Sequence, residues 1–310
     1  MNSKSAPIVF FGSGPVAARS LEFLLKHYEI EMVVTKKAVG GSASARAVLE
    51  VAQNPSRRSR NVAGVETPDE IRKIISAADL KSRLGVVVDF GLLIPPEVIG
   101  SFELGIVNSH FSLLPQWRGA DPVAFSILSG QPETGVSLML INERLDEGPL
   151  LAQKILPTSP QKLDSRQLTA GLLELSNELL RAVLPLYLAG KLKPYPQSDD
   201  VQPTYSRKLT KADGVIDWHK PADQLEREIR AFVDWPKSHA QIGGIKVIIT
   251  KARALTLKQN ARPGQLLIKD NRSLLVGCGS GCLSIDRLKP LAKPEMGAAA
   301  FLAGYGSRLT

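Results

Sequence analysis

The sequence predicts an α/β protein in two parts, with a doubly wound, mostly parallel sheet over residues 1–189 and a small β-barrel over residues 206–310. Continuous apolar runs alternate with amphipathic segments in the first part, which is typical of buried parallel strands covered by helices on both faces. Residues 190–205 are rich in proline and charge and show no hydrophobic period, as expected of a linker. Short β-type runs dominate the rest and favour a small barrel. A chain of 310 residues is long for one core and suits two domains.

The first part begins with a strand, a helix and a second strand. Residues 7–12 and 30–35 are apolar runs that predict strands, and residues 16–27 have a helical period between them. Residues 12–17 read Gly-Ser-Gly-Pro-Val-Ala, which fits the loop that binds dinucleotides. The second strand, however, leads into Lys36 rather than into the acidic residue that would hold a ribose. We therefore attribute the glycines to a tight turn and to close packing of the strand and helix.

Capping signals and apolar runs predict the remaining elements of the first part. Thr67 is followed by Pro68 and then by Glu70, which is the pattern of a helix N-terminus. Gly190 follows a long amphipathic segment, as is typical after the C-terminus of a helix. Apolar and amphipathic runs predict strands at residues 84–89, 106–107 and 136–141, and helices at residues 122–128 and 165–188.

The last part combines short strands with an excess of positive charge. One helix and four strands are predicted, at residues 222–232, 246–250, 265–268, 273–277 and 282–285. The net charge of the chain is +9; residues 1–205 contain 21 basic and 21 acidic side chains, whereas residues 206–310 contain 18 and 9. This excess favours a polyanionic partner such as nucleic acid. A solvated, lysine-rich surface is the alternative explanation.

The composition favours a soluble, cytoplasmic protein. No apolar run approaches the roughly 20 residues that span a bilayer, so no membrane association is expected. The chain enters its first strand almost at once, and no secretory signal is apparent. Cys278 and Cys282 are the only cysteines and lack a Cys-x-x-Cys spacing. They predict reduced core residues rather than a zinc site.

Two polar residues at the end of a predicted strand form the candidate catalytic pair. Asn108 and His110 are two residues apart, and side chains at that spacing share one face of a strand. An amide that donates to an oxyanion, beside an imidazole that moves a proton, suits chemistry on a carbonyl. Asp146, on a glycine-containing loop, is a plausible third member. Taken singly, each residue has a structural explanation, because a lone histidine is usually a core residue and Asn or Asp usually marks a turn.

The segments around these residues change that balance. Residues 108–110 lead into residues 112–120, which read Ser-Leu-Leu-Pro-Gln-Trp-Arg-Gly-Ala, and residues 145–148 read Leu-Asp-Glu-Gly. Together they resemble the formyltransferases that use 10-formyltetrahydrofolate. The resemblance extends over nearly the whole chain, and residues 213–218 and 229–232 point to the branch of that family that acts on tRNA.

The resemblance implies a fold and a reaction. It implies a Rossmann-like formyltransferase catalytic domain at residues 1–189, a linker at residues 190–205 and an OB-like, tRNA-binding domain at residues 206–310. The formyl donor would be 10-formyltetrahydrofolate and the acceptor the α-amine of initiator methionyl-tRNA, for the start of protein synthesis. No metal is required, and we expect a monomer.

The resemblance also assigns roles to individual residues. Asn108 and His110 would stabilise the tetrahedral oxyanion, His110 would pass a proton to the departing folate nitrogen, and Asp146 would orient His110. The folate would lie against two segments: Phe90, Gly91, Leu92, Leu93 and Ile94, and Ser112, Leu113, Leu114 and Pro115.

The predicted contacts with tRNA depend on basic side chains at positions where the sequence departs from the family pattern. The family usually carries a basic insertion after the second strand; here Lys36, Lys37 and Arg46 stand in its place, and residues 54–60 form another basic loop. Arg118 is a further candidate for a tRNA phosphate, although it could equally be scaffold packed on its neighbour.

Two further positions depart from the pattern. Gln116 stands where the family often has arginine, and Asp121 stands where it usually has a small apolar residue. Two other functions stay open: formyl transfer to an amino sugar nucleotide, and a tRNA-binding relative that has lost catalysis.

Overall fold

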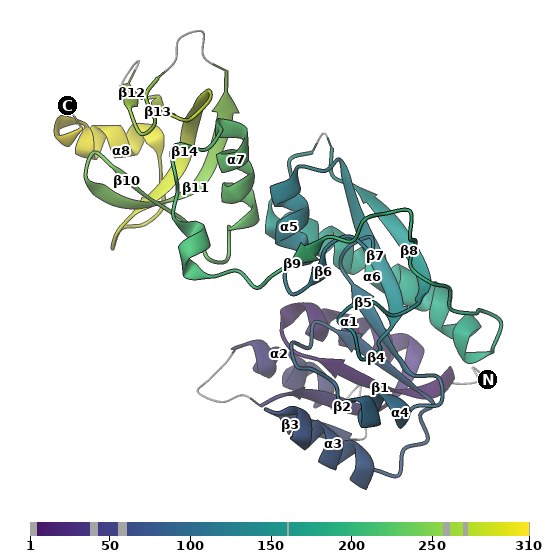
Figure 1. Cartoon of the computed structure of the whole chain (residues 1–310). Coiled ribbons are helices and arrows are strands. Elements are labelled where there is room, and N and C mark those ends of the chain that lie inside the picture. Colours follow the sequence, from purple (N-terminus) through teal and green to yellow (C-terminus); the bar gives the residue numbers. More distant parts are fainter. Residues whose placement is uncertain are drawn as a thin grey trace. The chain divides into compact units, whose positions relative to one another are not determined.

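A computed structural model describes residues 5–37, 43–54, 61–159, 161–256, 261–268 and 272–309 (Figure 1). The described part of the chain forms two compact units, each assembled from separate stretches of sequence. The first unit comprises Met1–Pro122, Glu133–Pro157 and Ala170–Ser206, and the second comprises Val123–Pro132, Thr158–Thr169 and Arg207–Thr310. No helix within the described ranges is long and apolar enough to cross a membrane.

The first unit is built on a mixed sheet in which, among the described residues, seven strands run in the order β3-β2-β1-β4-β5-β7-β8. Their bounds are β1 Ser5–Gly12, β2 Tyr28–Lys36, β3 Asn61–Val65, β4 Leu84–Val88, β5 Ile106–His110, β7 Glu133–Leu140 and β8 Leu150–Pro157. The pairs from β3 to β5 are parallel, and the pairs β5–β7 and β7–β8 are antiparallel. The predicted, mostly parallel sheet is confirmed.

Helices cover both faces of this sheet, as a doubly wound fold requires. On one face, Val9 and Phe11 of β1 share a buried apolar cluster with residues of α3 (Pro68–Ala77) and α4 (Pro96–Gly100). The other face carries α1 (Pro15–His27), which contacts α2 (Ala43–Ala52), and α6 (Ser165–Leu188). Helix α6 is held by a hydrogen bond of 2.6 Å between the Ser109 and Ser176 hydroxyls.

The turn after β1 explains its glycines by packing. A Cβ atom on Gly12 would lie 2.6 Å from the Phe10 ring and 2.7 Å from the Ala17 Cβ atom of α1, so only glycine allows this approach. Gly14 has a φ of 105°, a region that favours glycine. Thr67 caps α3 as predicted, since its side chain accepts the Glu70 N–H.

The second unit contains an antiparallel sheet. Within its described part the strand order is β10-β11-β14-β13-β12, with β15 paired to β14. The bounds are β10 Ser238–Ile242, β11 Ile245–Leu255, β12 Leu266–Ile268, β13 Leu274–Gly277, β14 Cys282–Pro290 and β15 Met296–Gly297. Helices α7 (Ala222–Ala231) and α8 (Ala298–Tyr305) complete a core that includes Leu225, Ile229 and Phe301. The sheet is a half-barrel, consistent with the predicted OB-like barrel.

Two separate stretches of sequence pack with this sheet in the second unit. Arg227 of α7 donates from Nε to the Leu128 carbonyl at the end of α5 (Pro122–Ser129), at 3.0 Å. Glu226 of the same helix pairs with Lys162 at 3.0 Å. The domain boundaries predicted from the sequence follow residue order and stay a prediction.

Candidate active site

The predicted pair of polar residues lies within β5 itself rather than just after it. Asn108 sits opposite Val87 of β4 and Met139 of β7, and His110 sits opposite Ser137 of β7. Because the two residues are two apart on one strand, their side chains leave the same face of the sheet. His110 is buried and Asn108 is half-buried.

Asp146 reaches the pair from the loop that connects β7 and β8. Its Oδ2 atom accepts the Gly119 N–H at 2.8 Å, and its Oδ1 atom accepts a longer hydrogen bond of 3.4 Å from Asn108 Nδ2. Asp146 is buried, and its φ of 54° lies in the left-handed region, which a residue with a side chain seldom adopts. The structure thus brings together three side chains that the sequence separates by up to 38 positions.

The two ring nitrogens of His110 face different partners. Nε2 lies 2.9 Å from the carbonyl oxygen of Trp117. Because a carbonyl only accepts, Nε2 must carry a proton. Nδ1 lies 3.7 Å from Oδ2 of Asp146, which is too long for a hydrogen bond. In the neutral ring, Nδ1 therefore offers its lone pair beside a carboxylate.

Arg118 lies next to this group but is engaged by protein. It is buried, and its Nη1 atom lies 3.3 Å from Oε1 of Glu147. Its Nε and Nη2 atoms both donate to the side-chain oxygen of Gln197, at 3.2 and 2.8 Å. These contacts support a scaffold role, and contact with a tRNA phosphate stays a prediction.

The two predicted folate segments leave neighbouring strands at the same edge of the sheet. Phe90, Gly91, Leu92, Leu93 and Ile94 follow β4, and Ser112, Leu113, Leu114 and Pro115 follow β5. Ile141 packs against the cluster that contains Ile94 and also against the cluster that contains Leu114. The structure therefore brings the two segments close together.

Within these segments, side chains divide between the core and solvent. Phe90, Ser112 and Leu114 are buried, with Phe90 packed edge-on against Phe11. Leu93 is 73% exposed, which makes it the most exposed apolar side chain of the two segments.

Side chains of β7 and β8 form hydrogen bonds with the turn after β5. The hydroxyl of Ser137 donates to the Ser112 carbonyl at 2.6 Å and accepts the Leu114 N–H at 3.0 Å. Gln153 Nε2 donates to the Leu114 carbonyl at 2.8 Å. These bonds tie the turn to the two neighbouring strands.

The basic residues predicted to contact tRNA are spread over several elements. Lys36 ends β2, and its Nζ atom would lie 2.8 Å from a Cβ atom on Gly91, so it reaches the predicted folate segment. Lys37 pairs with Glu70 at 2.8 Å, and Arg46 is exposed on α2. Residues 38–42 and most of the basic loop at 54–60, namely 55–60, lie outside the described residues.

Asp89 is a polar neighbour of this site that was not predicted from the sequence. It follows β4 with a φ of 47°, and its carbonyl accepts the Ser13 N–H at 2.8 Å. The residue as a whole is exposed, but desolvation of its carboxyl by the surrounding protein raises the pKa of Asp89 to about 6; nearby Lys36 lowers it and the negative charge of Asp121 raises it further. A charged residue directly after an all-apolar strand was the available signal.

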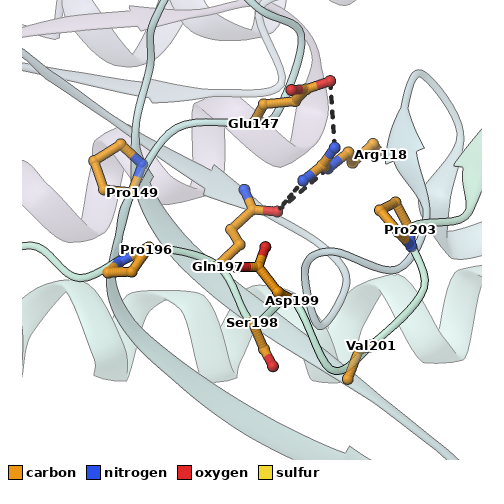
Figure 2. Close-up of a pocket in the computed structure, with 9 residues that line it drawn as sticks. All are labelled: Arg118, Glu147, Pro149, Pro196, Gln197, Ser198, Asp199, Val201 and Pro203. Atoms are coloured by element: carbon orange, nitrogen blue, oxygen red, sulfur yellow. Dashed lines mark hydrogen bonds and ion pairs between the residues drawn. The ribbon is translucent and has the colours of Figure 1, made fainter.

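A cavity of about 380 Å³ lies beside the group rather than over it. Arg118, Glu147 and Pro149 line one part of it, and the other lining residues belong to the predicted linker: Pro196, Gln197, Ser198, Asp199, Val201 and Pro203 (Figure 2). None of Asn108, His110 and Asp146 is among the residues that line it. In the described part of the chain, no group of three or more His, Cys, Asp or Glu side chains could hold a metal ion.

Comparison with known proteins agrees with this geometry. The model of the formyl transferase family matches residues 8–184, and the model of the formyl transferase C-terminal domain matches residues 208–306. The chain belongs to the formyl transferase family. A methionyl-tRNA formyltransferase of Roseiflexus castenholzii is 34% identical over 311 residues, with 99% of this chain and 97% of that protein covered.

Two solved structures share the fold of this family member. The N-formyltransferase of Helicobacter canadensis, in complex with folinic acid and dTDP-3-aminofucose, has a TM-score of 0.68 and 19% identity, with 91% of this chain and 98% of that chain covered. HypX of Aquifex aeolicus, in complex with tetrahydrofolic acid, has a TM-score of 0.63 and 17% identity, with 97% of this chain covered. The chain spans about half of HypX, 47% of its length.

Proposed function

We propose that this protein transfers the formyl group of 10-formyltetrahydrofolate to the α-amine of initiator methionyl-tRNA, giving formylmethionyl-tRNA for translation initiation. The proposal depends on one observation: Asn108, His110 and Asp146 lie next to one another, in a chain that belongs to the formyl transferase family. The near full-length similarity to methionyl-tRNA formyltransferases supports tRNA as the acceptor.

The chemistry needs a group that accepts a proton and a group that donates a hydrogen bond to the oxyanion. The α-amine attacks the formyl carbon, a C–N bond forms, and the carbonyl oxygen becomes an oxyanion. Asn108 has a second amide N–H besides the one that faces Asp146, and we assign it to that oxyanion. Collapse of the tetrahedral intermediate breaks the bond from carbon to folate nitrogen.

His110 moves the proton in this proposal. Its Nδ1 lone pair accepts the proton that the amine loses, and the same atom passes that proton to the departing folate nitrogen. Because Nε2 is held by the Trp117 carbonyl, only Nδ1 is available for the transfer. The carboxylate of Asp146, 3.7 Å away, stabilises the imidazolium that forms in between.

The donor site is formed by the segments after β4 and β5. We propose that folate lies along Gly91, Leu92, Leu93 and Ile94 and against Leu113, because these residues are accessible and lie at the edge where Asn108 and His110 end their strand. An apolar slot with backbone groups at its edge suits a flat pterin ring. Phe90, Ser112, Leu114 and Pro115 form its supporting layer.

We propose that the acceptor, tRNA, is bound through positively charged side chains. The excess of nine basic side chains in residues 206–310 favours a polyanion such as tRNA. We propose that Lys36, Lys37 and Arg46 contribute further phosphate contacts. For Arg118, which is buried and bonded to Glu147 and Gln197, we propose the scaffold role instead. We also propose that the protein acts as a cytoplasmic monomer.

Formyl transfer to an amino sugar nucleotide is the alternative, since the fold is shared with an N-formyltransferase that holds dTDP-3-aminofucose. The excess of positive charge in residues 206–310 argues against it, because a small substrate needs no such excess. The deciding experiment mixes the protein and its His110→Ala variant with 10-formyltetrahydrofolate and charged initiator tRNA. Formylmethionyl-tRNA made only by the unmodified protein supports the proposal. Turnover of amino sugar nucleotides, or folate binding without any turnover, would contradict it.

A further inference from the structure

The segment that the sequence predicts as a linker is bonded to the catalytic loops over much of its length. Tyr195 and Leu150 exchange backbone hydrogen bonds of 2.7 and 2.9 Å. At the other end, β9 (Tyr205–Ser206) pairs with β6 (Arg118–Gly119). We call residues 195–206 the strap.

One side chain of the strap reaches the backbone that presents Asp146. The Nε2 atom of Gln197 donates to the Asp146 carbonyl at 2.8 Å and to the Gly148 carbonyl at 2.9 Å. The Oε1 atom of the same amide accepts both hydrogen bonds from Arg118 (Figure 2). A single amide thus joins the loop that carries Asp146 to the loop that supplies the Gly119 N–H.

The chemistry of this contact requires an amide. Two carbonyl oxygens need donors on one side, and a guanidinium needs an acceptor on the other. A carboxylate at residue 197 would keep the acceptor for Arg118 but would place negative charge against the carbonyls of Asp146 and Gly148. The left-handed backbone of Asp146 adds to the need, because such a conformation persists only where neighbouring contacts hold it.

We propose that Gln197 is a positioning residue for the formyl transfer, which sets the place of Asp146 beside His110 and so links the strap to catalysis. The inference rests on the proposed function. Gln197 acts through Asp146 in this inference, since its amide is bonded to Asp146, Gly148 and Arg118.

The test compares Gln197→Glu with Ser198→Ala in the full chain. Ser198 is the next residue of the strap, lines the same cavity, and accepts only the Asp200 N–H among the described contacts. For Gln197→Glu we expect kcat to fall on the order of tenfold to a hundredfold with the KM of both substrates unchanged. Ser198→Ala should behave as the unmodified protein.

Hydrogen exchange supplies a readout that does not depend on turnover. The Gly119 N–H is bonded to Asp146 Oδ2, so its exchange reports where that carboxylate lies. We expect exchange at Gly119 to become on the order of tenfold faster in Gln197→Glu, with amides of β1 unchanged. If the Glu variant unfolds, which faster exchange in β1 would reveal, Gln197→Met replaces it as a neutral variant of similar length.

The outcomes separate this inference from the proposed function. An unmodified protein that does not formylate methionyl-tRNA contradicts the function, and exchange at Gly119 alone then decides whether Gln197 positions Asp146. A Gln197 variant with an unchanged kcat, or with unchanged exchange at Gly119, overturns the inference.

Discussion

Nδ1 of His110 faces Oδ2 of Asp146 across 3.7 Å, while the opposite ring nitrogen is bonded to the carbonyl of Trp117. The histidine is therefore fixed at one nitrogen and open at the other. A gap of this length leaves room for a proton to be taken up at Nδ1, after which the pair would gain a charge-assisted contact. The catalytic role assigned to His110 depends on this asymmetry.

Replacement of either member of the strand pair should abolish most activity without unfolding the protein. Removal of one oxyanion donor typically costs about 10²–10³ in rate, so we expect a loss of that size for Asn108→Ala, and His110→Ala should lose at least as much. Formylation kinetics measure the loss, and thermal unfolding serves as the control. Near-normal turnover by either variant would remove the residue from the mechanism.

The raised pKa of Asp89 should make the free energy of unfolding depend on pH. Desolvation of its carboxyl raises its pKa to about 6, above the unfolded value of 3.8, so the folded state binds the proton more tightly than the unfolded chain. The group therefore destabilises the fold as pH rises from about 4 to above 6. Asp89→Asn should raise the free energy of unfolding at pH 7.5 and change it little at pH 4. Urea denaturation at the two pH values measures this, and an equal effect at both would contradict the assignment.

Alanine substitutions at Gly119 and Gly190, which both have a positive φ, should distinguish the cost of backbone strain from the cost of a steric clash. A Cβ atom on Gly119 would lie 2.1 Å from the Ser206 carbonyl oxygen, whereas one on Gly190 would meet nothing within 4 Å. Gly190→Ala should cost about 1 kcal/mol for the left-handed backbone alone. Gly119→Ala should cost more and should also lower kcat, because the N–H that Asp146 accepts is displaced. Urea denaturation and turnover measurements on both variants test this. Equal losses of stability would contradict the predicted clash, because they would mean that the strap moves away from the added methyl group at little cost.

The charge of the second unit predicts a strong dependence of tRNA binding on salt. A protein that neutralises several phosphates loses affinity steeply as counterions are added, about 10³-fold or more between 50 and 200 mM for six or more contacts. Binding of folate should be much less affected. Filter binding of initiator tRNA across this range gives the slope. If the affinity for tRNA did not change with salt concentration, recognition of tRNA would not depend on the positive charge of residues 206–310.

The sequence predicted those features that a local pattern encodes. The period of two along a strand placed Asn108 and His110 on one face, and the Thr67 cap was predicted because its partner lies only three residues on. Strands β3 and β8 were missed: β3 is short and only partly buried, and β8 is an edge strand with exposed polar residues, so neither shows a clear apolar run. Helix α4 spans five residues, too few for a period to be recognised.

The part of the site that the sequence did not predict depends on contacts between distant segments. Gln197 lies in a proline- and charge-rich stretch whose composition is that of a free connection, and its bonds reach residues about fifty positions away. Nothing local marks it. The left-handed backbone of Asp146 is likewise imposed by its surroundings, since aspartate alone does not require it.

The second unit also includes residues 123–132 and 158–169, and this limits how the protein can be divided or recombined. A fragment that starts at residue 207 would carry Arg227 and Arg230 without the Leu128 and Leu163 carbonyls that accept their hydrogen bonds. Exchange of this unit between relatives by a single crossover would separate the same partners. Chimaeras should therefore exchange all three stretches together.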